Sequence, residues 1–257
     1  MNELRMLFMG RKENAANMLL WTLEQGINVV GVVTDSHLPN SPTAAVANRL
    51  KIPLLSMEEA EEKMRQNESW ADIVVSYLFW KKLRSPLIDK PKYGCINFHP
   101  AILPDYRGMG GYNYAILDKL KEWGATAHYV NEGIDTGEII DVYKFSFDYR
   151  LETAYSLENK TLKLQDDLYK SVIIRVMESG RLPATKQNMT EGRYISKKEM
   201  LDMMKINFDS DDIDTKIQAC WFPPYNGAYI EHKGKKYTLV NDYILSTLTK
   251  EGQTFQK

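Results

Sequence analysis

Short apolar runs alternate with amphipathic segments through the first half of the chain, and this rhythm constrains the fold more than any other feature. Strands are expected at Leu4–Met9, Asn28–Val33, Ile52–Leu55, Ile73–Ser76 and Gly94–Phe98. Helices are expected between them at Glu13–Glu24, Pro42–Leu50 and Met57–Asn67. Strands that alternate with helices form a mostly parallel sheet covered by helices on both faces. We therefore expect an α/β fold whose ligands gather at the carboxyl ends of the strands.

The second half has a different pattern. Strands are expected at Thr126–Val130 and Ile139–Phe147, followed by a long helix from about Thr153 to Ser179 that Gly180 ends. After a polar connection come a short helix, Ile213–Cys220, and a β-hairpin with strands 228–232 and 236–240. An isolated hairpin is marginal in water, so we expect it to pack on the main domain or on a second subunit. The predicted division is a domain of residues 1–183 and a small carboxyl-terminal region of residues 184–257.

Composition narrows the classes of function. The 33 basic and 34 acidic residues give a net charge of -1, without the basic excess usual in a nucleic-acid binder. No apolar stretch approaches the roughly 20 residues that span a bilayer, and the amino terminus lacks a signal-peptide pattern. Cys95 and Cys220 are far apart and suggest reduced thiols in a cytoplasmic protein. We expect no nucleic-acid partner and no membrane partner.

Several well-known site motifs are missing from the sequence. There is no phosphate-binding G-x-x-x-x-G-K-[ST], no G-x-G-x-x-G around Gly10, and no G-x-S-x-G nucleophile turn. The four histidines (His37, His99, His128 and His232) lack metal-ligand spacing, so no metal site is expected. For His128, which alternates with Thr126 on its strand, a packing or hydrogen-bonding role is favoured.

Two polar side chains share one face at the end of an expected strand. Side chains alternate along a strand, so Asn97 and His99 point the same way, while Ile96 and Phe98 point into packing. Pro100 cannot donate to the ladder and ends the strand. An amide and an imidazole are thus displayed where a doubly wound sheet places its site. On spacing alone, a structural asparagine and a hydrogen-bonded histidine that closes a loop are the favoured interpretation.

A single carboxylate follows between two glycines, in Gly133-Ile134-Asp135-Thr136-Gly137. Alone, Asp135 is explained by a tight turn of the kind aspartate favours. Together with His99 it gains weight, because a carboxylate bound to one ring nitrogen orients a histidine for acid–base chemistry.

The segments Ile96–Gly108 (INFHPAILPDYRG) and Gly124–Ile140 (GATAHYVNEGIDTGEII) resemble the folate-dependent formyltransferases. The resemblance covers roughly Leu4–Phe147. It implies a Rossmann-like catalytic domain, catalytic roles for Asn97, His99 and Asp135, and 10-formyltetrahydrofolate as co-substrate. It also implies a folate pocket beside Tyr77, Leu78, Phe79 and Trp80 and beside Gly133 and Ile134, with many contacts through the backbone. Simple packing of Tyr77, Phe79 and Trp80 is the alternative.

The acceptor is suggested by the tail and by what the chain lacks. Gly10–Asn14 is not the glycine-rich phosphate loop of the glycinamide ribonucleotide branch, and the tail is short for the β-barrel of the initiator-tRNA branch. The segment Ala219–Tyr229 resembles the aromatic turn of sugar-nucleotide N-formyltransferases. Trp221, Phe222 and Tyr225 could stack on a base, or could instead form a small aromatic core or a dimer interface. The segment Met109-Gly110-Gly111-Tyr112-Asn113 could admit sugar or pyrophosphate, with Arg11 and Lys12 as further phosphate candidates.

The resemblance thus implies formyl transfer to the amine of a nucleotide-linked sugar, and dTDP as the expected nucleotide rests on the resemblance alone. The expected setting is lipopolysaccharide O-antigen biosynthesis, and the expected assembly is a homodimer. The alternatives are an enzyme like methionyl-tRNA formyltransferase, and a non-catalytic or deformylating folate-binding relative.

Overall fold

A computed structural model describes residues 3–34 and 40–250, and His37 lies outside these residues. The chain forms two compact units that interleave along the sequence. The first unit comprises Met1–Arg107, Gly124–Tyr143 and Leu162–Gly192, and the second comprises Gly108–Trp123, Lys144–Thr161 and Arg193–Lys257. The predicted boundary between residues 183 and 184 cuts the chain once, and it stays a prediction.

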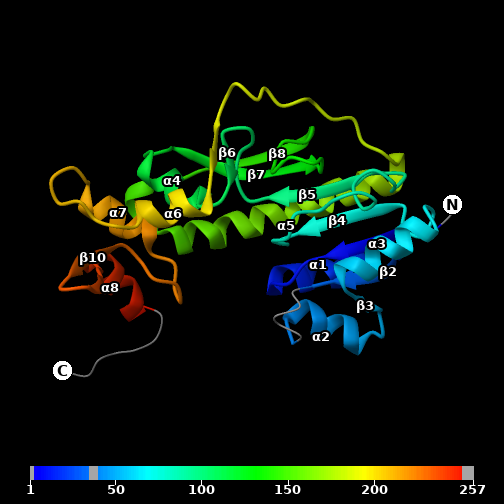
Figure 1. Ribbon diagram of the computed structural model, residues 1–257, viewed down its shortest axis with the longest axis horizontal. Coiled ribbons are helices and arrows are strands. Elements are labelled where there is room, and N and C mark those ends of the chain that lie inside the picture. The colour runs from blue at the N-terminus through cyan, green and yellow to red at the C-terminus, as the bar shows by residue number, and fades with distance from the viewer. Residues whose placement is uncertain (1–2, 35–39, 251–257) are drawn as a thin grey trace. The chain divides into compact units, whose positions relative to one another are not determined.

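A seven-stranded sheet has the order β3-β2-β1-β4-β5-β7-β8 (Figure 1). Its strands are β1 (Arg5–Met9), β2 (Asn28–Val33), β3 (Leu54–Leu55), β4 (Ile73–Tyr77), β5 (Cys95–His99), β7 (Glu122–Tyr129) and β8 (Ile139–Ser146). The pairs from β3 through β5 are parallel, whereas β7 runs antiparallel to β5. The predicted α/β fold with a mostly parallel sheet is therefore confirmed.

The five-residue strand β1 shows why the sheet is buried on both faces. Its alternating residues Met6 and Phe8 enter one apolar core, and Leu7 and Met9 enter the other. The first core also receives α1 (Glu13–Glu24), α2 (Pro42–Arg49) and part of α5 (Ala154–Ser179), and the second receives α3 (Met57–Gln66). A strand covered on both sides reads as a continuous apolar run, as β1 and β2 do.

Capping residues in the sequence determine where several helices begin and end. Ser41 and Ser56 accept backbone N–H groups at the starts of α2 and α3, and Glu59 completes a capping box at α3. At the far end of α5, Gly180 has φ +74° and donates its N–H to the Val176 carbonyl, as the sequence predicts. No helix within the described residues is both long and apolar enough to cross a bilayer.

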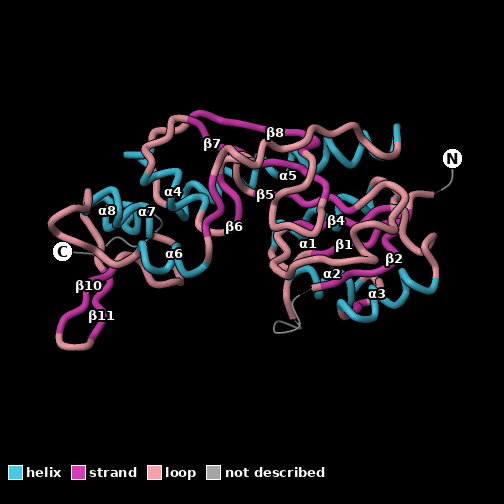
Figure 2. Tube along the Cα trace, turned by 45° about the horizontal axis from the view of Figure 1, so that its top comes forward, coloured by secondary structure: helices cyan, strands magenta, loops and turns pink. Residues whose placement is uncertain are grey.

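The second unit contains mostly short elements. They are α4 (Gly111–Leu117), a 3-10 turn (Tyr149–Leu151), α6 (Lys197–Met203), α7 (Ile213–Cys220), β10 (Tyr229–His232), β11 (Lys235–Thr238) and α8 (Asp242–Lys250). Two further strands of three residues are β6 (Tyr106–Gly108) and β9 (Arg193–Ile195). The predicted hairpin is present as β10 and β11 (Figure 2). The small core of the second unit contains Ile206, Ile217, Cys220, Ala228 and Ile244.

Two helices of this unit were not predicted. Helix α6 is only seven residues long, and Ser196 caps it by accepting the Glu199 N–H. This capping serine is hard to recognise in the sequence because charged residues follow it. In α8, Ile244 is buried while Leu245 and Leu248 are exposed, so packing against the rest of the second unit selects one face.

Candidate active site

The carboxyl end of β5 carries the amide and the imidazole that the sequence singles out. Ile96 and Phe98 are buried in the first core, as predicted. Asn97 and His99 point to the other face, where Asn97 is partly buried and the His99 side chain is 10% exposed. Side-chain alternation along one strand is enough to bring the two groups together.

The imidazole of His99 lies between two acceptors. Its Nε2 is 2.8 Å from the backbone carbonyl of Tyr106, and its Nδ1 is 3.6 Å from Oδ2 of Asp135. The first distance is that of a hydrogen bond, whereas the second is too long for one and brings the carboxylate only close to the ring. The structure thus places Asp135 beside His99, and their catalytic roles remain a prediction.

The loop that carries Asp135 has an irregular backbone held by local contacts. Asp135 itself has φ +54°, which is uncommon for a residue with a side chain. The Asn131 side-chain oxygen accepts hydrogen bonds from the Gly133 N–H at 3.0 Å and from the Thr136 hydroxyl at 2.7 Å. A turn therefore fixes the carboxylate, as the Gly-Ile-Asp-Thr-Gly sequence suggests.

The same loop is anchored from outside by a side chain that the sequence did not single out. The Gln187 amide donates to the carbonyl of Asp135 at 2.9 Å and to that of Gly137 at 2.6 Å. Gly137 itself approaches β7 so closely that an added Cβ would lie 1.7 Å from the Tyr129 carbonyl oxygen. A glycine is therefore required at position 137 for the loop to close onto the sheet.

His128 is the functional candidate that sequence reasoning missed. It is 2% exposed, and its Nε2 lies 3.1 Å from Nδ2 of Asn97 and 3.7 Å from Oδ1 of Asp135. The sequence offered one signal: His128 and Thr126 are two residues apart on an expected strand, so their side chains share one face, and this strand leads to the segment that carries Asp135. Recognising it also requires knowing that β7 pairs with β5.

The predicted folate-pocket residues lie in different surroundings. The Tyr77 ring is fully buried, 5.7 Å from the Phe98 ring, and its hydroxyl donates to Asp166. Leu78 has φ +55° and packs on the first core, and Phe79 packs on the second. Trp80 is 50% exposed, with the Lys81 amine 5.5 Å from its ring centre.

Packing thus explains the Tyr77 side chain, and any folate contact there is made by its backbone. In the other half of the predicted pocket, Gly133 and Ile134 are exposed, Ile134 to 45%. Folate binding by all these residues stays a prediction.

Residues of the predicted sugar-binding segment begin a helix and make packing and hydrogen-bond contacts in the second unit. Gly110 has φ +72° and precedes α4, which begins at Gly111, while Met109 is 45% exposed. The Asn113 amide donates to the Ala219 carbonyl at 2.7 Å. Burial, with the nearby Glu158 carboxylate, raises the pKa of the Tyr112 hydroxyl, which is therefore protonated at neutral pH.

The aromatic turn divides into a packed part and an exposed part. Trp221 is partly buried against the small core of the second unit, which fits the structural alternative. Phe222 packs edge-on against Tyr155 at 6.0 Å, and its ring centre is 5.9 Å from that of Tyr225. Tyr225 is 70% exposed. In the first unit, Arg11 and Lys12 are partly buried, and Lys12 precedes α1.

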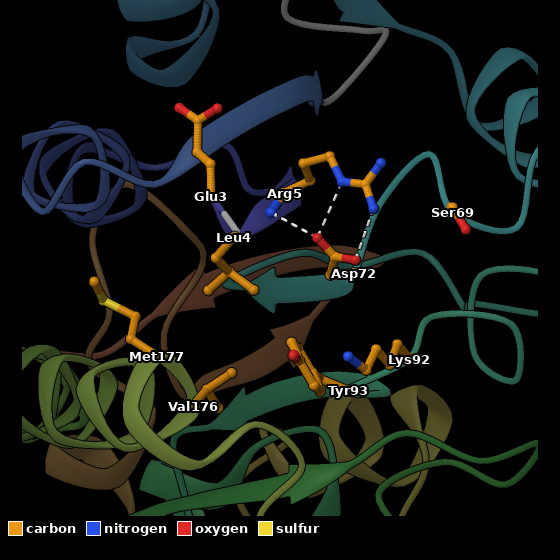
Figure 3. Close-up of a pocket in the computed structure, with 9 residues that line it drawn as sticks. All are labelled: Glu3, Leu4, Arg5, Ser69, Asp72, Lys92, Tyr93, Val176 and Met177. Atoms are coloured by element: carbon orange, nitrogen blue, oxygen red, sulfur yellow. Dashed lines mark hydrogen bonds and ion pairs between the residues drawn. The ribbon is translucent and has the colours of Figure 1, made fainter. Parts of the chain in front are cut away.

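A cavity of about 530 Å³ lies at the opposite end of the parallel strands, where they begin (Figure 3). Arg5 opens β1, Asp72 precedes β4 and Tyr93 precedes β5, and all three line it. The Asp72 carboxylate accepts three hydrogen bonds from Arg5, at 2.9, 3.1 and 2.9 Å. This pair ties two strand starts together, which gives it a structural role.

Comparisons with known proteins agree with this geometry. The formyl transferase family model matches residues 4–173. A methionyl-tRNA formyltransferase of Lachnospira eligens is 28% identical over 267 residues, covering 96% of this chain and 82% of that protein.

Two solved structures share the fold. A 4-N formyltransferase from Francisella tularensis has a TM-score of 0.79 at 20% identity and covers 92% of this chain and 96% of its own. An N-formyltransferase from Helicobacter canadensis, solved with folinic acid and dTDP-3-aminofucose, has a TM-score of 0.73 at 25% identity and covers 91% and 86%. Since the family model spans well over half of the chain and includes Asn97, His99 and Asp135, the chain belongs to the formyl transferase family, as a folate-dependent formyltransferase.

Proposed function

We propose that this protein transfers the formyl group of 10-formyltetrahydrofolate to the amine of a nucleotide-linked amino sugar, with dTDP as the nucleotide. The observation that carries the transfer chemistry is the placement of Asn97, His99 and Asp135 at one strand end, with Asp135 3.6 Å from His99. The acceptor class is supported by the Helicobacter canadensis structure solved with a dTDP-linked amino sugar.

In the proposed reaction the acceptor nitrogen attacks the formyl carbon, and the carbonyl π electrons move onto the formyl oxygen. Asn97 donates an amide N–H to that developing oxyanion. When the intermediate collapses, the bond from the formyl carbon to N10 of the folate breaks. The proton lost by the amine passes to N10, so tetrahydrofolate leaves neutral at that nitrogen.

His99 moves that proton in the proposed mechanism. Its doubly protonated ring suits delivery to N10, and its neutral ring suits removal from the amine. Because Nε2 contacts the Tyr106 carbonyl at 2.8 Å, this contact must break before that nitrogen can reach the reacting groups. Asp135 holds the ring from Nδ1 during the exchange.

A second candidate acceptor is initiator methionyl-tRNA, because the Lachnospira eligens relative carries that activity in its name. The near-neutral net charge of -1 argues against it, since tRNA binding draws on a basic surface. A deformylating or non-catalytic relative is the third alternative. Roles in O-antigen synthesis, a homodimer and a cytoplasmic location remain predictions.

The deciding experiment incubates the full chain and 10-formyltetrahydrofolate with dTDP-, GDP- or UDP-linked amino sugars, and separately with methionyl initiator tRNA. Mass spectrometry of the acceptor and release of tetrahydrofolate are measured together. We expect a 28 Da gain on a dTDP-amino sugar and none on its N-acetylated counterpart, which lacks the free amine. Formylation of tRNA alone would contradict the sugar proposal, and tetrahydrofolate release without any acceptor would indicate a deformylase.

A further inference from the structure

Three polar side chains form a row across neighbouring strands of the sheet. Ser76 on β4 is in register with Asn97 on β5, which is directly opposite His128 on β7. The Ser76 hydroxyl donates to Oδ1 of Asn97 at 2.8 Å, and Nδ2 of Asn97 lies 3.1 Å from Nε2 of His128. Ser76 is 4% exposed and His128 2%, so water has little access to either partner of Asn97.

The backbone determines which nitrogen of His128 carries the proton. Nδ1 lies 2.8 Å from the Tyr129 carbonyl oxygen, which can only accept, so Nδ1 is the donor. In the neutral ring Nε2 is then an acceptor, and it receives a hydrogen from the Asn97 amide. Every hydrogen bond in the row therefore runs in a defined direction.

This direction orients the Asn97 amide. If the amide were rotated by 180°, its oxygen would face the Nε2 lone pair of His128, and two acceptors would meet in a buried site. Protonating Nε2 would instead set an N–H against the Asn97 N–H. The neighbouring Asp135 carboxylate, 3.7 Å from Nε2, is too distant to replace the Asn97 hydrogen bond.

We propose that His128 is a positioning residue that holds Asn97 with its amide nitrogen fixed as the donor, leaving one of its two N–H hydrogens for the formyl oxygen. The inference rests on the proposed function in one respect, the oxyanion role of Asn97. In this proposal the buried His128 acts through Asn97 and not on a substrate. Ser76 supports the same orientation from the oxygen side.

The first test reads the tautomer directly and needs no turnover. Long-range ¹H–¹⁵N correlation spectra of the ¹⁵N-histidine-labelled full chain at neutral pH should show His128 protonated at Nδ1, with Nε2 bearing a lone pair. In Asn97→Ala, the ¹⁵N shift of Nε2 should move as its hydrogen bond is lost. A doubly protonated ring, or a proton on Nε2, would overturn the inference.

The second test is a double-mutant cycle on tetrahydrofolate release. His128→Ala should lower kcat about tenfold, less than the roughly 10²–10³-fold expected from deleting an oxyanion donor. KM for the formyl-folate should stay unchanged. In an Asn97→Ala background, His128→Ala should have no further effect, because its partner is gone. A merely structural role would lower both backgrounds alike.

Two variants guard against a trivial loss of folding. His128→Gln retains a side-chain oxygen that can accept from Asn97, so most of the rate should return. His232→Ala, on the exposed hairpin strand β10, should leave kcat unchanged. Additive losses in the cycle, or no rescue by glutamine in a folded variant, would contradict the positioning role. If the wild type released no tetrahydrofolate with any acceptor, the proposed function would fail, and the tautomer spectra would still decide the inference.

Discussion

A carboxylate lies at each end of the parallel strands: Asp72 where the strands begin, here called the amino-terminal edge, and Asp135 where they finish, here called the carboxyl edge. The two are held in different ways. At the amino-terminal edge, Asp72 accepts three hydrogen bonds from Arg5 at 2.9 to 3.1 Å. At the carboxyl edge, Asp135 faces two imidazoles at distances of 3.6 and 3.7 Å and has backbone φ +54°. The contrast fits a structural role for the pair at the amino-terminal edge, and it fits the proposed catalytic role of the groups at the carboxyl edge.

The largest effect should come from the carboxyl edge. Asn97→Ala removes the proposed oxyanion donor, and kcat should fall by roughly 10²–10³-fold, or about 3–4 kcal/mol of transition-state stabilisation. Steady-state kinetics with the amine acceptor that the wild type formylates measure this loss. Thermal unfolding of the same variant serves as the control, since it reports the cost of losing the bonds to Ser76 and His128. A folded variant with near-normal kcat would remove Asn97 from the mechanism.

A smaller effect is expected from the loop that carries Asp135. Gly137→Ala would place a methyl group 1.7 Å from the Tyr129 carbonyl oxygen, so the loop must shift away from β7. We expect a destabilisation of about 1–3 kcal/mol, as for other overpacked sites, and a loss of kcat. Urea unfolding and kinetics measure the two effects. Gly234→Ala, in the hairpin turn with open space around it, is a steric comparison, although its positive φ adds a small cost of its own.

If Gly137→Ala lowered stability while kcat stayed normal, the position of Asp135 would not matter for catalysis. The comparison between the two edges would then lose its functional half, because both carboxylates would be structural.

Part of this arrangement could be predicted from the sequence. Period-two alternation placed Asn97 and His99 on one face, and the apolar runs predicted the buried parallel strands. His128 was missed because its importance depends on β7 pairing with β5, a long-range contact that local spacing does not encode. Tyr77 was grouped with its neighbours by proximity in the chain, yet strand alternation turns its ring into the core.

The smallest effect should come from the amino-terminal edge, and it should appear in stability alone. Partial burial by itself would raise the pKa of Asp72, but the hydrogen bonds from Arg5 outweigh it and hold the pKa below the ordinary value of 3.8. Asp72→Asn weakens these bonds at a partly exposed site, so the free energy of unfolding should fall by about 1 kcal/mol at pH 7. The kcat should be unchanged.

The pH dependence gives this last prediction its sign. A carboxylate whose pKa is lower in the folded state stabilises the protein above its unfolded pKa, and the contribution is lost as the pH falls toward the folded value. Wild type and Asp72→Asn should therefore differ most near neutral pH and converge as the pH drops below about 4. Urea unfolding of both proteins across this range measures the gap, with Asp209→Asn, at an exposed aspartate, as the matched control. A gap that widened in acid, or a loss of kcat in Asp72→Asn, would show that the two edges are not separated as their hydrogen bonding indicates.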